Sequence, residues 1–154
     1  MSAVNLAIDI LRQEEGYRER VYYCSEGYPT IGIGKRLGPK WAPLSNYQFT
    51  VSRALAEFWL REDVEKIQTR LYELLPYCHE LTDTRMAVLI SMAYQMGIDG
   101  LFGFANTLAA FECGDYAEAA KEMRDSKWFR KDTPERAERH ARAVERDEYR
   151  YTTQ

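Results

Sequence analysis

The chain has 154 residues, of which 45% are apolar and 29% charged, and its net charge of −3 gives no reason to expect nucleic acid as a partner. A chain of this size forms one domain, or two lobes that share a core, and no segment approaches the roughly 20 apolar residues of a membrane span. The three cysteines and two histidines lack metal-ligand spacing, so neither a metal site nor another cofactor is expected.

The first predicted element is a helix that begins after Ser2 and ends at Gly16. Serine is a favourable N-cap residue, apolar positions then recur at the helical spacing, and glycine is a common helix stop. Glu15 is therefore expected at the very end of this helix, where its carboxylate can project past the last turn.

A hairpin follows, with strands predicted over residues 21–24 and 28–35. If its turn is centred on Gly27, Cys24 and Thr30 become cross-strand partners on the same face of the sheet. A two-residue turn would shift this register. The pairing of Cys24 with Thr30 is therefore a prediction that depends on the turn.

A long helix is predicted from about Val51 to Pro76. Its length of about 25 residues corresponds to nearly 40 Å at about 1.5 Å per residue, which suggests a strut between two lobes. Charged residues fill the gaps between the apolar positions. The apolar positions expected on one face are Leu55, Phe58, Trp59, Val64, Ile67, Leu71 and Leu74.

The last third of the chain is predicted to be helical throughout. A helix that is apolar nearly all round begins at Thr82 and ends at Gly97, as expected of a helix buried in a bundle. Shorter helices are expected over 101–112 and 116–124, and Thr133 is the expected cap of the last helix.

These elements define a mostly helical α+β fold. Residues 1–50 are expected to form a small N-terminal lobe with a β-hairpin sheet, and residues 51–76 the long connecting helix. Residues 77–154 would form an all-helical C-terminal lobe, on which the first helix packs. No internal repeat or low-complexity segment interrupts this layout.

The spacing of Glu15, Cys24 and Thr30 carries a resemblance to a known family. Eight residues separate the first two and five the last two, within the segment "EGY-TIGIG". This pattern resembles the catalytic motif of phage-type lysozymes, glycoside hydrolase family 24, in which aspartate or cysteine occupies the second position. The resemblance resumes over 87–108 and 126–137. It implies a lysozyme-like fold and cleavage of the β-1,4 bond between N-acetylmuramic acid and N-acetylglucosamine in peptidoglycan.

Glycoside cleavage needs an acid that protonates the leaving oxygen, and the resemblance gives this role to Glu15. Glu14, its neighbour, is expected to be a solvated surface residue. Thr30 would hydrogen-bond the attacking water. Cys24 could act as a thiolate base, as a nucleophile or as a group that positions water, or it could be a small half-buried hydrophobe.

The resemblance also suggests substrate-binding residues in both lobes. Arg136 matches an arginine that pairs with the catalytic glutamate across the cleft, although it could be an ordinary first-turn residue. Lys35 stands where a histidine is familiar in the family, which puts a histidine-centred ion pair in doubt. The other positions that match sugar-contacting or cleft-lining residues, each of which could equally be plain core or surface, are Glu26, Tyr28, Gln95, Phe104 and Trp128.

Three functions are compatible with these residues. The first is a peptidoglycan-degrading phage endolysin that hydrolyses the glycan. The second is a lytic transglycosylase, in which the substrate's own hydroxyl attacks and leaves an anhydro-sugar; the presence of Cys24 instead of a second acid permits it. The third is a wall-binding relative without activity, which the retention of Glu15 disfavours.

The start of the sequence lacks the basic residues and apolar core of a signal peptide. An endolysin of this kind would remain in the host cytoplasm and reach the cell wall through a separate holin-type protein that permeabilises the membrane. It is expected to be a monomer without stable membrane insertion, and its partner is peptidoglycan.

Overall fold

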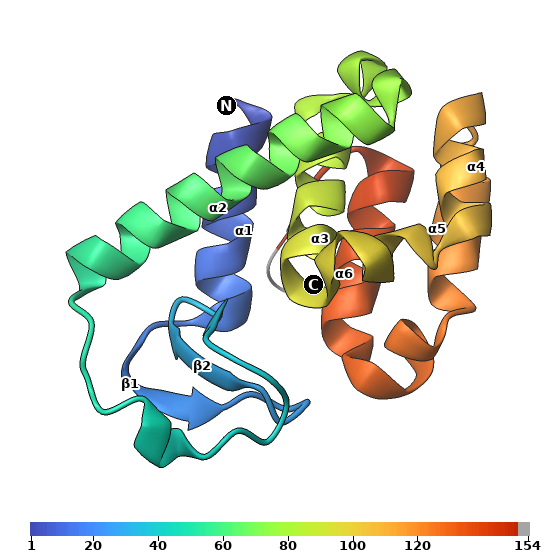
Figure 1. The fold of residues 1–154 in the computed structure, drawn as a ribbon. Helices are drawn as coiled ribbons and strands as arrows, with labels where there is room; N and C mark the ends of the chain where they lie inside the picture. Colours follow the sequence, from blue (N-terminus) through green and yellow to red (C-terminus); the bar gives the residue numbers. More distant parts are fainter. Residues whose placement is uncertain (151–154) are drawn as a thin grey trace.

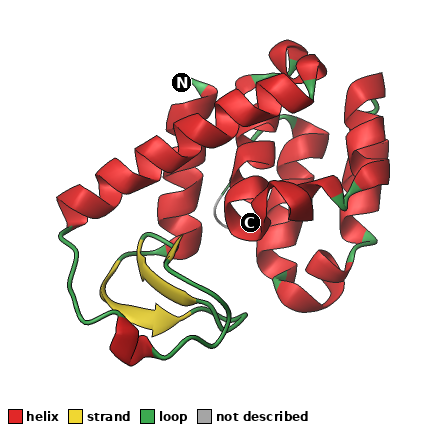
Figure 2. Ribbon diagram, viewed as in Figure 1, coloured by secondary structure: helices red, strands yellow, loops and turns green. Residues whose placement is uncertain are grey.

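The computed structural model describes residues 1–150 and shows a small antiparallel sheet on one side and a group of helices on the other (Figures 1 and 2). The long helix α2 runs from the sheet side to the helical side (Figure 1). The elements are α1 (Ala3–Glu15), β1 (Arg18–Tyr23), β2 (Pro29–Gly32), β3 (Lys35–Arg36), α2 (Arg53–Leu74), α3 (Asp83–Phe102), α4 (Ala105–Cys113), α5 (Tyr116–Arg124) and α6 (Pro134–Arg146).

Helix α1 begins and ends where the sequence predicts. The Ser2 hydroxyl accepts a hydrogen bond from the Asn5 backbone N–H at 3.1 Å, which satisfies one of the free donors at the helix start. Gly16 follows the last turn with a φ of 66°, a conformation that favours glycine. Glu15 is therefore the last helical residue, as expected.

The hairpin of β1 and β2 forms, but its register differs from the prediction. Thr30 pairs with Tyr22, so the predicted pairing of Thr30 with Cys24 is wrong. The Gly27 N–H donates to the Cys24 carbonyl at 2.9 Å, and the Cys24 N–H donates to the Tyr28 carbonyl at 3.0 Å. The loop thus has three residues, with Gly27 in the left-handed position at its end and not at its centre.

The long helix predicted over residues 51–76 is present as α2, although its buried face differs in part from the prediction. It begins after the cap Ser52 and ends two residues before Pro76. Leu55, Phe58 and Leu74, predicted on the buried face, are 43%, 63% and 37% exposed. The helix lies at the surface and is covered on one side only. Its fully buried residues are Ala56, Leu60, Val64 and Leu71, and the predicted Trp59 and Ile67 are partly buried against the core.

Helix α3 is the buried helix that the sequence predicts. The Thr82 hydroxyl caps it, and it packs against α1, α2 and α6. Gly97, with a φ of 81°, breaks it as predicted, but the chain then resumes a helical course to Phe102. The predicted helix over 101–112 is consequently shifted and appears as α4, whereas α5 matches the prediction for 116–124.

Helix α6 begins at Pro134 as expected, yet the side chain of Thr133 does not cap it. The Thr133 hydroxyl accepts a hydrogen bond from the Gln95 amide at 3.2 Å. Within residues 1–150 no single helix has the length and apolar character needed to cross a bilayer. Helices α3 and α4 reach those criteria only as a pair bent by 100°.

Candidate active site

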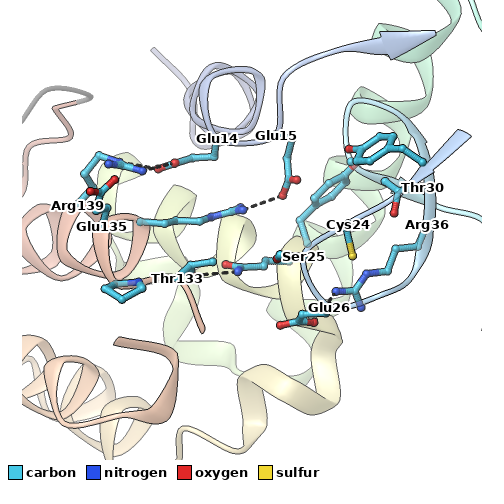
Figure 3. A pocket seen from close by; sticks show the side chains of 16 residues that line it. Glu14, Glu15, Cys24, Ser25, Glu26, Thr30, Arg36, Thr133, Glu135 and Arg139 are labelled. Atoms are coloured by element: carbon cyan, nitrogen blue, oxygen red, sulfur yellow. Dashed lines mark hydrogen bonds and ion pairs between the residues drawn. The ribbon is translucent and has the colours of Figure 1, made fainter. Parts of the chain in front are cut away.

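A cavity of about 590 Å³ lies where α1, the hairpin, α3 and α6 meet. The three motif residues Glu15, Cys24 and Thr30 all line it, although the first is separated from the others by a strand. Figure 3 shows Glu15 on one side of this cavity and Cys24 and Thr30 on the other. The tertiary structure therefore brings the predicted motif together around one space.

Glu15 is held from the helical side of the cavity by Arg136. The guanidinium Nη1 donates to the Glu15 carboxylate at 2.8 Å, and the two side chains are 19% and 8% exposed. On the sheet side, Gly34 makes room for the carboxylate, because a Cβ atom at that position would lie 2.7 Å from it. Arg136 and Gly34 together fix the orientation of the Glu15 carboxylate, which lines the cavity.

Arg136 is itself held by a closed ring of hydrogen bonds. Its Nη2 donates to the Ser91 hydroxyl at 3.4 Å, and Ser91 contacts His140 Nε2 at 2.7 Å. His140 Nδ1 contacts the Arg136 carbonyl at 2.9 Å. Because a carbonyl can only accept, Nδ1 carries the proton and Nε2 accepts from Ser91.

Burial, and to a smaller extent the nearby charge of Arg136, lower the pKa of His140 to about 3. The imidazole is therefore neutral at physiological pH, which suits its place behind a guanidinium. Sequence patterns do not reveal this role, because His140 lies 49 residues from Ser91.

Glu14, expected to be solvated, is buried beside the same helix. Its side chain is 6% exposed and accepts two hydrogen bonds from Arg139, at 2.5 and 2.9 Å. The Tyr149 hydroxyl donates to it at 2.7 Å. Burial raises the pKa of Glu14, but the bonds from Arg139 and Tyr149 outweigh this effect and the net shift is downward. The expectation of a surface residue was wrong.

The hairpin side of the cavity carries fewer polar contacts. Thr30 is 2% exposed and its hydroxyl donates to the Tyr28 carbonyl at 2.8 Å, so its oxygen is left to accept. Cys24 is a half-buried free thiol. Tyr22, which the sequence did not single out, also lines the cavity; burial raises its pKa, and the charge of Glu15 raises it further.

The predicted contact residues Glu26 and Tyr28 converge on Arg36, which sequence reasoning missed. Glu26 lines the cavity and pairs with Arg36 at 3.1 Å. The guanidinium lies 4.0 Å from the centre of the Tyr28 ring. The Tyr28 ring thus packs against the guanidinium of Arg36, which itself lines the cavity. No local sequence pattern marks Arg36, because it reaches Tyr28 only through the pairing of β2 with β3, where Arg36 stands opposite Thr30.

Gln95, Trp128 and Phe104 form a second contact group. The Trp128 indole N–H donates to the Gln95 amide oxygen at 3.0 Å, and Phe104 meets the indole edge-on at 5.8 Å. All three line a second cavity of about 530 Å³, which shares Glu26 and Gln95 with the first. Trp128 is only 4% exposed, so it supports Gln95 more than it offers a surface.

Two further residues connect the cavity to its surroundings. Tyr94 lines it and donates to the Ile33 carbonyl at 2.6 Å, and burial raises the pKa of this phenol, which keeps it a neutral donor. Lys35 pairs with Asp63 at 2.8 Å on the outer side, so an ion pair exists there without a histidine. Across residues 1–150 no cluster of three or more acidic, histidine or cysteine side chains could hold a metal.

A glutamate fixed at a helix end, facing a hydroxyl in a cavity between a small sheet and a helical lobe, defines a glycosidase of the lysozyme type. The phage lysozyme family matches residues 12–143 of this sequence. The chain belongs to that family, whose members are peptidoglycan-hydrolysing glycoside hydrolases.

Two relatives show how this domain occurs in other proteins. The probable T4-type lysozyme 1 of Dictyostelium discoideum is 28% identical over 158 residues, which cover 89% of this chain and 92% of the relative. The pre-baseplate central spike protein Gp5 of Enterobacteria phage T4 is 29% identical over 143 residues, or 79% of this chain. The match spans about a quarter of the spike protein, 24% of its length.

Proposed function

We propose that this chain hydrolyses the β-1,4 bond between N-acetylmuramic acid and N-acetylglucosamine in peptidoglycan, with Glu15 as the general acid. The observation that carries the proposal is the placement of Glu15, held by Arg136 at 2.8 Å, across one cavity from Thr30 and Cys24. A positioned acid and a positioned water are the two requirements of glycoside hydrolysis.

In this mechanism Glu15 gives its proton to the glycosidic oxygen while the bond between that oxygen and the sugar carbon breaks. The sugar carbon gains positive charge and is attacked by water. Arg136 stabilises the carboxylate that remains on Glu15 after proton transfer. This stabilisation favours the step because the negative charge develops beside a fixed cation.

Thr30 fits the role of the group that orients the attacking water. Its hydroxyl proton is already donated to the Tyr28 carbonyl, so its oxygen can accept a hydrogen bond from that water. We assign the Cys24 thiol, on the same wall of the cavity, to the second contact of the same water. The bond to the sugar carbon then forms with the water oxygen, and the released proton leaves to solvent.

We further propose that the chain acts as a monomeric endolysin. It would accumulate in the host cytoplasm until a separate holin-type protein permeabilises the membrane, and then degrade the wall. The support is membership of a phage family. Expression in bacteria tests this route: growth should continue until a permeabilising agent is added, and lysis should follow only for the active chain. Lysis without the agent would contradict it.

The reaction itself is tested by digestion of purified peptidoglycan in oxygen-18 water, followed by mass spectrometry. Heavy oxygen at new muramic acid reducing ends is expected. A matched Glu15→Gln variant should keep the fold and lose activity by about 10²- to 10⁴-fold, the usual contribution of a general acid. Full wall digestion by the folded variant would remove Glu15 from the mechanism.

A lytic transglycosylase is the second candidate, because Cys24 supplies no second carboxylate on the far wall of the cavity. In that reaction the substrate's own hydroxyl forms the new bond and no solvent oxygen enters the product. Unlabelled anhydro-muramic ends in the same digestion would identify it and would make Thr30 and Cys24 bystanders.

A further inference from the structure

Arg36 is the cavity arginine to which the proposed mechanism gives no task. Three arginines line the cavity around Glu15. Arg136 is paired with Glu15 and is 8% exposed. Arg139 donates two hydrogen bonds to Glu14 and is 17% exposed. The side chain of Arg36 is 34% exposed, so it is the cavity arginine most accessible to a ligand.

The guanidinium of Arg36 has hydrogen-bond donors to spare. Its Nη2 donates to the Glu26 carboxylate at 3.1 Å, and within residues 1–150 its Nε and Nη1 donate to no other group. The guanidinium carbon lies 4.0 Å from the centre of the Tyr28 ring, which restricts its position. Arginine presents its N–H donors as a planar fork that matches both oxygens of a carboxylate. Arg36 can therefore keep its bond to Glu26 and still bind a second acceptor.

The sheet places Arg36 beside the proposed reaction centre. Arg36 stands opposite Thr30 in the pairing of β2 with β3, and neighbouring strands lie about 4.8 Å apart. Opposite residues of an antiparallel pair share one face of the sheet, and both of these residues line the cavity. Figure 3 shows them with Cys24 on the wall across from Glu15. A sugar attacked by the water at Thr30 would therefore lie next to the guanidinium.

In the proposed reaction the sugar at that point is N-acetylmuramic acid, because the bond at its anomeric carbon is the one that breaks. This sugar differs from N-acetylglucosamine by a lactyl group, which ends in a carboxyl group and carries the stem peptide. A glycan without peptides therefore bears free lactyl carboxylates, and a glycan with peptides bears the carboxylates of its stems. Both sources put an anion on the substituent of the sugar that is cut.

We propose that Arg36 is a specificity-determining residue that binds a carboxylate on the lactyl or peptide substituent of this muramic acid, an inference that rests on the proposed function. The free N–H donors of the guanidinium would bond the carboxylate oxygens. Such charge-assisted hydrogen bonds are about twice as strong as bonds to a neutral acceptor. The site therefore prefers a glycan whose carboxylates are free over the same glycan with neutral amides in their place.

The experiment compares solubilised peptidoglycan with the same material after carbodiimide coupling in excess methylamine, which converts its carboxylates to neutral amides. Initial rates over a range of substrate concentrations give kcat and KM on each. The unmodified chain should show a KM about tenfold lower on the untreated material, the effect of one charge-assisted hydrogen bond, with little change in kcat. Arg36→Met removes the donors, so it should show the same KM on both materials.

Arg53→Met is the matched control. Arg53 also lies over a tyrosine, at 4.6 Å from the centre of the Tyr17 ring, but it is not among the described residues that line the cavity. It should keep the full preference for untreated peptidoglycan. Arg36→Lys keeps the charge without the fork and should retain part of the preference. Because the preference is a ratio of two KM values within one variant, a smaller folded fraction does not alter it.

Two results overturn the role of Arg36. One is an equal KM of the unmodified chain on untreated and amidated peptidoglycan. The other is a preference that persists undiminished in Arg36→Met, which would mean that another group reads the carboxylate.

Peptide-stripped glycan distinguishes the two sources of the carboxylate. Removal of the stems by an amidase leaves free lactyl carboxylates, which the same coupling converts to amides. A preference for the uncoupled stripped glycan that depends on Arg36 identifies the lactyl carboxylate. A preference that depends on Arg36 only when the stems are present identifies a carboxylate of the peptide.

Failure of the proposed function is a different result, namely the absence of new sugar ends when the unmodified chain digests peptidoglycan. Arg36 is then tested by sedimentation of the Glu15→Gln chain with insoluble walls, untreated and amidated. Binding that favours the untreated wall through Arg36, with no cutting by the unmodified chain, would retain the carboxylate site and refute the hydrolase. Cutting of both materials with equal KM would refute the role of Arg36 alone.

Discussion

The two walls of the proposed catalytic cavity are built in different ways. On the helical wall, Arg136, Ser91 and His140 form a closed ring of hydrogen bonds with side chains that are almost wholly buried. On the hairpin wall, Thr30 makes one side-chain hydrogen bond to the backbone and Cys24 is a free thiol. One wall is a buried polar network, and the other has few side-chain hydrogen bonds and keeps unused acceptors.

This difference follows from what each wall must do. The helical wall holds the Glu15 carboxylate through Arg136, and a hydrogen-bonded polar network in a low-dielectric interior favours one arrangement, although the buried Arg136 Nε has no hydrogen-bond partner within residues 1–150. In the proposed mechanism the hairpin wall faces a water and a sugar that enter and leave, so its groups must keep hydrogen-bonding capacity for them. The proposed reaction needs both features: hydrogen bonds that hold the acid on one wall, and unused hydrogen-bond acceptors that orient the water on the other.

Among variants that keep Glu15, the largest expected effect comes from displacing its carboxylate. Gly34→Ala would place a Cβ 2.7 Å from the Glu15 carboxylate and would also strain a backbone with a φ of +67°. We expect wall hydrolysis to fall by about 100-fold, because a small misplacement of a catalytic group costs about that much.

Gly114→Ala is the control for this change. It imposes comparable strain at a φ of +73°, with nothing within 4 Å of the new Cβ. Both variants should lose about 1–2 kcal/mol of stability in denaturant unfolding, but only the first should lose activity. Equal activity in the two would show that the hairpin wall tolerates a displaced acid.

The next prediction tests whether the hairpin wall contributes to peptidoglycan hydrolysis. Cys24→Ala should lower turnover of peptidoglycan by about tenfold or more, within the range of groups that assist proton transfer or water positioning. Cys24→Asp should remain active, since aspartate can hold the same water. Cys113→Ala, at an exposed cysteine, is the control. Unchanged turnover in Cys24→Ala would make this thiol a space-filling group.

The helical wall predicts a pH dependence of stability. The pKa of His140 is about 3 in the folded chain and about 6.5 when unperturbed. Below pH 6.5 the unfolded chain therefore binds a proton that the folded chain does not, and stability should fall by about 1.4 kcal/mol per pH unit toward pH 3.

His140→Val should remove this slope and cost about 1–3 kcal/mol at pH 7, because Ser91 loses its partner. Denaturant unfolding at pH 7, 6, 5 and 4 measures both effects. His79→Gln, at the exposed histidine, is the control. An identical slope in His140→Val and the parent chain would show that the network does not hold a neutral imidazole.

The smallest effect is expected outside both walls, at the ion pair between Lys35 and Asp63. The two side chains are 36% and 22% exposed, and pairs of this kind contribute about 0.2–1 kcal/mol. Lys35→Ala should therefore change stability by less than about 1 kcal/mol and leave wall hydrolysis near that of the parent. A loss of several kcal/mol would mean that this pair, and not only the buried network, supports the cavity.

Local patterns were sufficient to predict much of this fold. Ser2 and Gly16 define the first helix and so place Glu15 at its end, because capping depends on residues within one turn. The buried helix after Thr82 can also be predicted from local sequence, because apolar residues occupy nearly every side of it. The existence of the hairpin is also a local property, but its register depended on where Gly27 sits in the loop.

The sequence by itself determined the elements, the motif spacing of Glu15, Cys24 and Thr30, and the family they indicate. Only the tertiary structure decided which distant groups hold the acid. The contact of Glu15 with Arg136 spans 121 residues, and no local pattern specifies a contact at that separation. The burial of Glu14 was misjudged for the same reason, since its partner Arg139 comes from α6 and reaches it only when the lobes pack.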